Sequence, residues 1–263
     1  MNTQIQKLKK RDKILSPPQI SVAIVTYNEE RIIEKTLSAI HNWVDEIIVV
    51  DSFSTDKTIN ILEMFSVKLF QESWQGYAKQ KNLAISKCMG DWILVLDADE
   101  VVSPVLKDEI LNVIKKPKDC AGFKVKRKFF VGKRWIRYGG YFPDYQLRLF
   151  KNNIGASFCD REVHESIVLN GEIGYLKNPI EHYAYKDLKD YQKNLEKYAE
   201  LASKEIKDKS FYVPWLRAAW AFGFRYIGRL GFLEGQLGFD LARSYSRYVY
   251  KKYELASKTI GLK

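Results

Sequence analysis

The sequence predicts an α/β fold in which a mostly parallel sheet is flanked by helices and followed by a helical C-terminal extension. Short apolar runs rich in β-branched residues alternate with segments whose apolar residues recur at helical spacing. Such alternation is typical of a parallel sheet with right-handed helical crossovers. The 263 residues are long for one average domain and short for two, which favours one α/β domain with an appendage.

The predicted elements follow in chain order. The strands expected to be buried on both faces are residues 20–26, 46–51, 67–70 and 92–97. The helices expected between them are residues 30–41, 56–65 and 77–87. After Asp99 the pattern is less regular, with strands expected over residues 123–130 and 145–151 on either side of a glycine turn.

The C-terminal part of the sequence is predicted to be helical. Asp187 can cap a helix that carries apolar residues on one face as far as Ile206, and a second helical region follows. The predicted division is a basic leader over residues 1–18, an α/β domain over residues 19–185 and a helical, basic and aromatic extension over residues 186–263.

Charge and composition narrow the function classes. The 46% hydrophobic and 29% charged residues exclude a disordered or fibrous chain, and the net charge of +11 favours an anionic partner such as nucleic acid, a sugar nucleotide or an acidic lipid. The three cysteines are widely spaced, which predicts neither disulfides nor a zinc site. The leader has no secretory apolar run, and no long uncharged apolar stretch occurs, so we expect a cytoplasmic protein.

Basic and aromatic residues concentrate in two segments. Residues 120–143 hold seven Lys or Arg and no acid, interleaved with seven aromatic residues. Residues 209–252 hold eight basic and two acidic residues beside several Trp and Phe, a mixture typical of helices that lie on a membrane surface. The alternative for the second segment is a helical lid or a dimer surface that buries its aromatic rings.

The end of the fourth strand carries the sequence Asp97-Ala98-Asp99. Ligands of parallel sheets bind at the carboxyl ends of the strands, so two carboxylates at this point are expected to attract a cation. Divalent ions such as Mg²⁺ prefer a few carboxylates together with phosphate oxygens and water. We therefore expect a metal that bridges the protein and a diphosphate, the alternative being a solvated turn.

Other polar residues fall at the same edge. Asp51 can accept hydrogen bonds from a base or ribose, or it can cap the helix that follows. Asn28 is ambiguous in the same way, because it is a natural helix cap. Lys79 and Lys81 open a helix and can neutralise phosphate, or they can lie on a solvated helix face.

Two histidine positions lie in the later half. Glu165, next to His164, can act as a general base toward an acceptor hydroxyl, and His182 can complete a metal shell. Hydrogen-bonded structural histidines are the alternative for both positions.

Four motifs, VTYNEE from Val25, VVDSFSTDKT from Val49, Lys81-Asn82 and LDADE from Leu96, resemble in order and spacing those of family 2 glycosyltransferases with the GT-A fold. The resemblance implies a nucleotide-diphosphate-sugar donor, Mg²⁺ or Mn²⁺ at the D-x-D motif, and inversion at the anomeric carbon. It implies the following donor-site residues: Thr26, Tyr27, Asn28 and Asp51 for the nucleoside, Lys81 where the family often has Arg, and Asp97 and Asp99 for the D-x-D.

The later half is similar to bacterial lipopolysaccharide-core glucosyltransferases through YGGYFPDYQLRLF from Tyr138, VHES from Val163 and IEHYAY from Ile180. This resemblance implies UDP-glucose as donor and matches Glu165 to the base and His182 to the metal shell. Since His164-Glu165 replaces the usual Glu-Asp pair, Asp144 is a competing base. It further implies an acidic glycolipid acceptor that meets residues 124–141, and peripheral attachment of the C-terminal extension to the inner leaflet.

Three other functions compete with this interpretation. A nucleic-acid-binding protein suits the charge and the aromatic residues but leaves Asp97 and Asp99 unexplained, so we expect no nucleic-acid partner. A dehydrogenase or nucleotidyltransferase is disfavoured because no G-x-G-x-x-G or P-loop motif is present. A catalytically silent sugar-nucleotide binder would differ only in lacking transfer.

Overall fold

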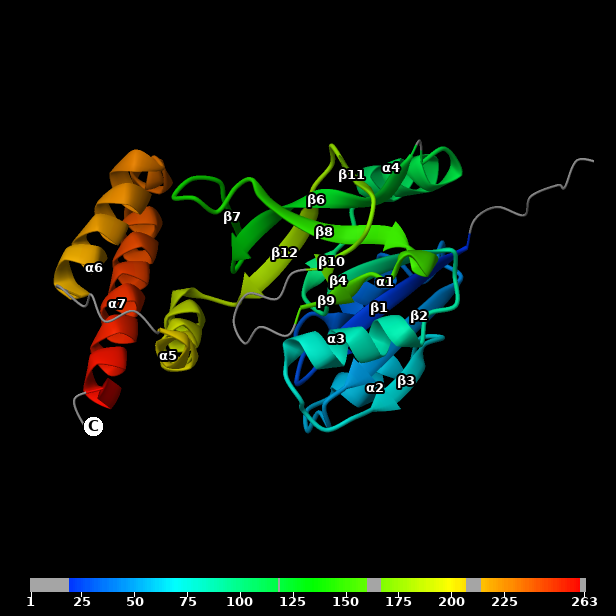
Figure 1. The fold of residues 1–263 in the computed structure, drawn as a ribbon, viewed down its shortest axis with the longest axis horizontal. Coiled ribbons are helices and arrows are strands. Elements are labelled where there is room, and N and C mark those ends of the chain that lie inside the picture. Colours follow the sequence, from blue (N-terminus) through cyan, green and yellow to red (C-terminus); the bar gives the residue numbers. More distant parts are fainter. Residues whose placement is uncertain (1–18, 118, 160–166, 207–213, 261–263) are drawn as a thin grey trace, which may run out of the picture.

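A ten-stranded mixed sheet forms the centre of the protein (Figure 1). The computed structural model describes residues 19–117, 119–159, 167–206 and 214–260. The strand order is β3-β2-β1-β4-β8-β6-β12-β5, and β11 and β7 both pair with β6. The strands of this sheet are β1 Ile20–Thr26, β2 Glu46–Asp51, β3 Lys68–Gln71, β4 Trp92–Asp97, β5 Glu100–Val101, β6 Cys120–Val131, β7 Arg134–Ile136, β8 Asp144–Lys151, β11 Glu172–Tyr175 and β12 Ile180–Tyr185. A two-stranded sheet contains β9 Ser157–Phe158 and β10 Ile167–Val168.

The first half of the sheet is parallel, as the sequence predicts. β3, β2, β1 and β4 pair in parallel, and three of the four strands have the predicted bounds, whereas β3 begins one residue later. Alternate residues of these strands enter two hydrophobic clusters on opposite faces: Val22 and Leu94 lie in one, Ala23 and Ile93 in the other. Burial on both faces explains why β1, β2 and β4 are mostly apolar. The prediction that β3 is also buried on both faces is wrong, because β3 lies at the edge of the sheet and exposes Lys68 and Gln71.

The helices beside the sheet are α1 Ile33–Ser38, α2 Thr58–Leu62, α3 Tyr77–Ser86 and α4 Pro104–Lys115. α1, α2 and α4 contribute to the cluster on one face and α3 to the other. α1 and α2 are shorter than predicted, because no side chain caps their first turns and turns flank them. The sequence analysis did not predict α4, although Ser103 caps it and Pro104 occupies its first position.

The second half of the sheet is mixed. β8 lies antiparallel between β4 and β6, and β12 runs parallel to β6 and antiparallel to β5. The predicted strands at residues 123–130 and 145–151 are present as parts of β6 and β8, which are longer. The insertion of β8 next to β4 brings side chains from the later half to the end of β4.

Three long helices follow the sheet: α5 Leu188–Glu205, α6 Pro214–Gly223 and α7 Gly235–Ile260. A π-helical turn, Phe224–Gly228, and a 3-10 turn, Gly231–Glu234, join α6 to α7. Asp187 caps α5, as predicted, by accepting a hydrogen bond from the Asp190 amide at 2.8 Å.

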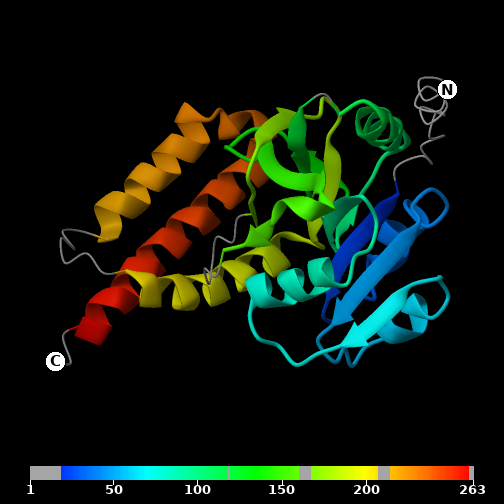
Figure 2. The ribbon, with the colours of Figure 1, turned by 45° about the vertical axis from the view of Figure 1, so that its right-hand side comes forward.

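α7 packs against both α5 and α6, and all three helices lie at one end of the sheet (Figures 1 and 2). A hydrophobic cluster containing Val131, Ile136, Tyr191 and Leu241 joins α5 and α7 to β6 and β7. No helix in the described part of the chain combines the length and the apolar character that a bilayer-spanning segment requires.

Candidate active site at the carboxyl edge of the parallel strands

Three adjacent parallel strands end in polar residues at one edge of the sheet. β1, β2 and β4 end at Thr26, Asp51 and Asp97. Because ligands of parallel sheets bind beyond the carboxyl ends of the strands, this edge is the place to look for chemistry.

Asp51 and Asn28 shape the loops of this edge. Asp51 is fully buried, and its carboxylate accepts hydrogen bonds from the Thr26 hydroxyl at 2.9 Å and from the Ser54 amide at 2.8 Å. Oδ1 of Asn28 accepts from the Thr55 amide at 2.8 Å. Neither residue caps a helix in the structure, so both connect the β1 and β2 loops, and their contact with a nucleoside stays a prediction.

Two aromatic rings are exposed beside these loops. Tyr27 is 57% exposed and Phe53 54% exposed. Asn28 and Phe53 have φ values of 56° and 59°, which non-glycine residues adopt rarely and which are frequent at functional sites. The exposed rings provide flat surfaces on which a base can stack.

Asp97 lies among three cationic side chains. Lys81 Nζ is 2.8 Å from Oδ1, Arg148 Nη2 is 2.5 Å from Oδ2, and Arg127 Nη1 is 3.7 Å from Oδ2. Burial by itself would raise the pKa of the Asp97 carboxyl, but the three positive charges hold that pKa well below its usual range. Asp97 is therefore ionised, and its carboxylate holds these cations at the edge of the sheet.

Glu100 pairs with two of the cations that contact Asp97. Its carboxylate is fully buried, lies 2.5 Å from Arg148 Nη2 and 3.4 Å from Arg127 Nη1, and accepts the Asp97 amide at 3.1 Å. The sequence analysis did not identify Glu100, Arg127 or Arg148 as site residues. Arg127 and Arg148 reach Asp97 through the pairing of β6 with β8 and of β8 with β4, which no local pattern encodes.

Asp99 and His182 lie together, although they come from distant parts of the sequence. Nε2 of His182 is 3.3 Å from Oδ2 of Asp99, and pairing of β12 with β5 sets His182 opposite Glu100. Burial would lower the pKa of His182, but Asp99 raises it overall. Burial would likewise raise the pKa of Asp99, but His182 lowers it overall. Each group thus favours the charged form of the other.

Glu29 adds a further carboxyl to this region. Burial, together with the negative charge of Asp99, raises the pKa of Glu29 to about 7. Burial is the largest cause of this shift, and the charges of Asp56 and Asp97 add to it, whereas Arg31 opposes it. The sequence analysis gave Glu29 no role, and its position three residues after the end of β1 was the available signal.

The residues present fit a hard divalent cation. Asp99 offers carboxylate oxygens and His182 an imidazole nitrogen, whereas both oxygens of Asp97 already face cations. Within the described ranges no group of three His, Cys, Asp or Glu side chains forms a closed metal site. A two-donor site suits an ion that takes its remaining ligands from a diphosphate and water.

Of the two candidate bases, Asp144 lies in the part of the chain that the structure describes and Glu165 does not. Nε and Nη2 of Arg127 donate to Oδ2 of Asp144 at 2.8 and 2.5 Å, and the Gln146 amide donates to Oδ1 at 2.7 Å. Burial would raise the pKa of Asp144, but Arg127 lowers it overall, which weakens Asp144 as a base. Glu165 lies outside the described residues, as does His164, so its role stays a prediction.

The polar residues of α3 separate into three environments. Lys81 is buried against Asp97, as a lysine aimed at the carboxyl edge requires. Lys79 is exposed, which matches the solvated-face alternative. The Asn82 side chain exchanges two hydrogen bonds with the backbone of Phe158, at 3.0 and 2.7 Å, and so ties α3 to β9.

Comparisons with known proteins relate the chain to proteins that are named as glycosyltransferases. A match of 161 residues is 34% identical to a protein of Rickettsia bellii named as an uncharacterized glycosyltransferase, and it covers 60% of this chain but 55% of that protein. The lipopolysaccharide core biosynthesis glycosyltransferase LpsC of Rhizobium meliloti is 26% identical over 261 residues, covering 91% of this chain and 94% of LpsC. A crystal structure of S. aureus TarS matches with a TM-score of 0.45 and 16% identity, covering 93% of this chain and 92% of the other.

The sequence profile described as glycosyl transferase family 2 matches residues 21–166, more than half of the 263 residues. That stretch includes β1 to β4 and the Asp97 and Asp99 carboxylates, which are the parts of the site that the motifs predicted. The chain therefore belongs to glycosyl transferase family 2.

Proposed function

We propose that the protein is an inverting glycosyltransferase that moves glucose from UDP-glucose to a hydroxyl of a lipopolysaccharide-core acceptor. The observation that carries the proposal is the Asp99 and His182 pair, which lies beside an Asp97 carboxylate that holds Lys81 and Arg148. Family membership supports the transfer reaction, and the similarity to LpsC, a lipopolysaccharide core biosynthesis glycosyltransferase, supports the class of acceptor.

The donor would lie along the carboxyl edge of β1, β2 and β4. Tyr27 and Phe53 offer exposed rings for the uracil base, and the loops that Asp51 and Asn28 hold in place define the nucleoside site. Lys81, placed by Asp97, would face the diphosphate and oppose the negative charge that grows there as the sugar leaves.

Asp99 and His182 are the residues that would hold a divalent ion, Mg²⁺ or Mn²⁺. When bound, such an ion supplies positive charge to the departing diphosphate. His182 must lose its proton to act as a ligand, so its raised pKa makes binding compete with protonation. Glu29, whose pKa is raised to about 7, would add negative charge near Asp99 once it ionises.

The acceptor hydroxyl would attack the anomeric carbon on the face opposite the leaving diphosphate, which inverts the configuration. Glu165 is the proposed general base that takes the hydroxyl proton, with Asp144 as the alternative. The ion pair between Asp144 and Arg127 favours Glu165, because a carboxylate with a lowered pKa accepts protons less readily.

We further propose that the protein acts in the cytoplasm on the inner face of the membrane. Large apolar side chains between residues 215 and 233 are exposed, among them Trp215, Ile227 and Leu233. Arg217, Arg225 and Arg229 lie in the same stretch, and arginine with exposed Trp and Ile suits an anionic bilayer surface. A liposome flotation assay tests this part, and an absence of salt-sensitive binding to anionic vesicles would contradict it.

A transfer assay tests the proposed activity. The full chain is incubated with UDP-[¹⁴C]glucose, Mn²⁺ and lipid-linked inner-core oligosaccharide, and label in the glycolipid is measured. Transfer that EDTA abolishes and Mn²⁺ restores is the expected result. Donor binding without transfer or donor hydrolysis would instead indicate a silent sugar-nucleotide binder.

A further inference from the structure

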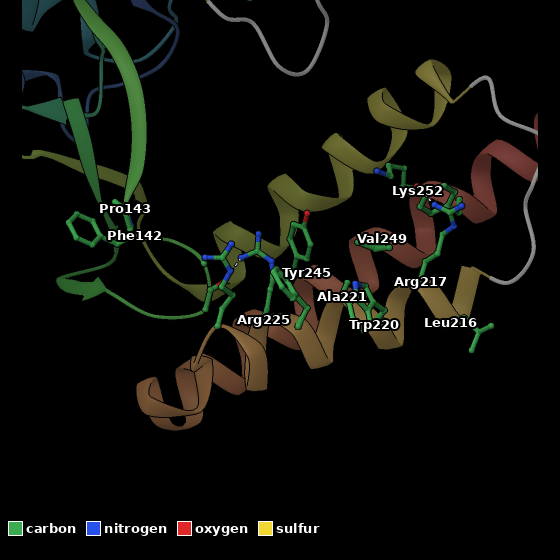
Figure 3. A pocket seen from close by; sticks show the side chains of 15 residues that line it. Phe142, Pro143, Leu216, Arg217, Trp220, Ala221, Arg225, Tyr245, Val249 and Lys252 are labelled. Atoms are coloured by element: carbon green, nitrogen blue, oxygen red, sulfur yellow. Dashed lines mark hydrogen bonds between the residues drawn. The ribbon is translucent and has the colours of Figure 1, made fainter. Parts of the chain in front are cut away.

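A cavity of about 600 Å³ lies between the C-terminal helices and the loop that precedes β8 (Figure 3). Its walls come from α6, the π-helical turn and α7, and from Gly139, Gly140, Phe142 and Pro143 on the facing loop. It is separate from the carboxyl edge described above, because none of the residues that line it belongs to that site.

The cavity is strongly basic. Arg217, Arg225, Arg229 and Lys252 line it, and no acidic residue does. Among the residues that the structure describes, none of these four side chains has a carboxylate within 4.0 Å. A concave surface with uncompensated positive charge concentrates anions.

Two of the cations are held in place by neighbouring groups. Nη1 of Arg225 donates to the Gly139 carbonyl at 2.8 Å, and its guanidinium lies 3.7 Å from the centre of the Tyr245 ring. Nη1 of Arg217 donates to the Tyr253 hydroxyl at 3.0 Å. These contacts orient the guanidinium groups without neutralising them, which suits recognition of a phosphate.

The outer wall of the cavity is apolar and exposed. Trp220 is 74% exposed, Leu216 49% and Phe224 45%. The Trp220 and Phe224 rings stack with their centroids 6.3 Å apart. A ligand that satisfies both the cations and this wall must carry a negative group next to an apolar part.

The cavity adjoins the chain segment that leads to the catalytic edge. Pro143 lines it, and the next residue, Asp144, is paired with Arg127, which in turn lies near Asp97. The donor is expected on the far side of that ion-pair network, along β1 and β2. The cavity is therefore better placed to bind the acceptor than the donor.

We propose that this cavity binds the phosphate group of an amphiphilic, phosphorylated acceptor, with Arg217, Arg229 and Lys252 as its cationic donors. Trp220 and Phe224 contact the apolar part of the same molecule. This inference rests on the proposed function, because it names the feature by which the acceptor is recognised. The occupant of the cavity is a single amphiphile, whereas exposed side chains outside the cavity, such as Trp215 and Ile227, would meet the bilayer surface.

Binding of a soluble probe tests the proposal. Dihexanoyl phosphatidic acid carries a phosphate monoester on short acyl chains and is used below its micelle concentration with the full chain in titration calorimetry. Inorganic phosphate and vesicles of phosphatidylcholine with phosphatidylglycerol are the comparison ligands. The Arg217→Gln/Lys252→Gln double variant is compared with Lys115→Gln/Lys116→Gln, which removes the same charge from the exposed end of α4.

We expect the wild-type protein and the α4 variant to bind the probe equally, and the cavity variant to bind it about tenfold or more weakly, as loss of about 1.4 kcal/mol implies. Trp220→Ala, at a site that is 74% exposed and not needed for the core, should also weaken binding. Equal affinity of the cavity variant, equal affinity for inorganic phosphate, or binding to vesicles but not to the monomeric probe would each overturn the proposal.

An experiment with the sugar donor distinguishes failure of this inference from failure of the proposed function. UDP-glucose with Mn²⁺ is added to the same proteins and the melting temperature is followed. A donor-induced rise in the wild-type protein without any affinity for the probe overturns only the cavity assignment. Absence of both the donor effect and sugar transfer in the wild-type protein overturns the proposed function.

Discussion

Nε2 of His182 lies 3.3 Å from Oδ2 of Asp99, and this contact joins the last strand of the sheet to the D-x-D motif. β12 carries His182 to this place by pairing with β5, the two-residue strand that begins directly after Asp99. The backbone reinforces the arrangement, because the Tyr183 amide donates to the Asp99 carbonyl at 2.9 Å. A carboxylate and an imidazole are thereby held side by side.

Removing either member of this pair should abolish the effect of the metal. Asp99→Asn and His182→Gln are each expected to lower sugar transfer by about two orders of magnitude, which is the scale of one general catalytic group or metal contact. Initial rates measured across a Mn²⁺ titration check this. Asp108→Asn, an exposed carboxylate on α4, is the matched control. Wild-type Mn²⁺ dependence in Asp99→Asn would remove Asp99 from the metal site.

The pH dependence of metal binding should follow His182. Its pKa lies above the usual 6.5, so the pair with Asp99 stabilises the metal-free fold below that pH and loses this contribution as the pH rises through the raised pKa. Metal binding needs the neutral imidazole and should strengthen over the same window. Melting temperatures with and without Mn²⁺ between pH 6 and pH 9 should therefore diverge as the pH rises. A constant difference would contradict this.

Glu29→Gln should stabilise the metal-free protein at alkaline pH. Because the pKa of Glu29 rises from 4.5 to about 7 on folding, ionisation of this carboxyl opposes folding increasingly as the pH rises from 4.5 through 7. The expected gain at pH 8 is on the order of 1 kcal/mol after solvent screening, with none at pH 4. Denaturant unfolding at both pH values measures it, with Glu172→Gln on the exposed part of β11 as control. A gain of equal size at pH 4 would exclude titration as its cause.

The buried network beneath Asp97 should be sensitive to the loss of one partner. Arg148→Met leaves the fully buried Glu100 carboxylate without its closest cation, which is expected to cost about 3 kcal/mol or more. Glu100→Gln/Arg148→Met should lose less than the sum of the two single variants, because the pair acts as a unit. Urea unfolding of the four proteins measures the coupling, and strict additivity would contradict the pairing.

Glu165→Gln should lower turnover by about two orders of magnitude while leaving UDP-glucose binding intact, because a general base contributes a rate factor of that size. Asp144→Asn should have the smaller effect, since Asp144 is engaged with Arg127. Steady-state transfer rates and donor-induced melting shifts check both variants. Near wild-type transfer by Glu165→Gln, with loss in Asp144→Asn, would assign the base to Asp144.

The parallel half of the fold could be predicted because each of its strands is recognisable from the residues of that strand alone. Residues 20–26 and 92–97 are short, nearly continuous apolar runs with β-branched residues, which favour a strand buried on both faces. Helix bounds were less predictable, because the first residues of α1 and α2 carry no capping side chain. α4 was missed although its Ser103-Pro104 start is a recognisable signal.

The site was predictable where the topology alone fixes it. Asp97 and Asp99 had to lie at the carboxyl edge once β4 was identified, and Lys81 was expected to face it. Arg127 and Arg148 could not be assigned, because they reach Asp97 only through pairings between distant strands. Arg127 had seemed part of a basic surface, whereas its guanidinium is largely enclosed in the ion-pair network.

Residues 120–143 also hold aromatic rings that pack against the C-terminal helices. Phe129 stacks on Tyr141 at 4.7 Å between ring centroids, and the Tyr141 hydroxyl lies 2.8 Å from that of Tyr191 on α5. The interleaving of rings and cations in residues 120–143 therefore serves the junction between sheet and helices as well as any acceptor surface. Sequence alone cannot separate these uses, because both require the same residue types.

The most direct test of the account is the melting temperature of the wild-type and Asp99→Asn proteins with UDP-glucose, each with and without Mn²⁺. We expect UDP-glucose and Mn²⁺ together to raise the wild-type melting temperature by about 5 °C or more at a donor concentration near 100 times the Kd, and to leave Asp99→Asn almost unchanged. An equal rise in both proteins, or no rise in the wild-type protein, would contradict a donor site organised by Asp99.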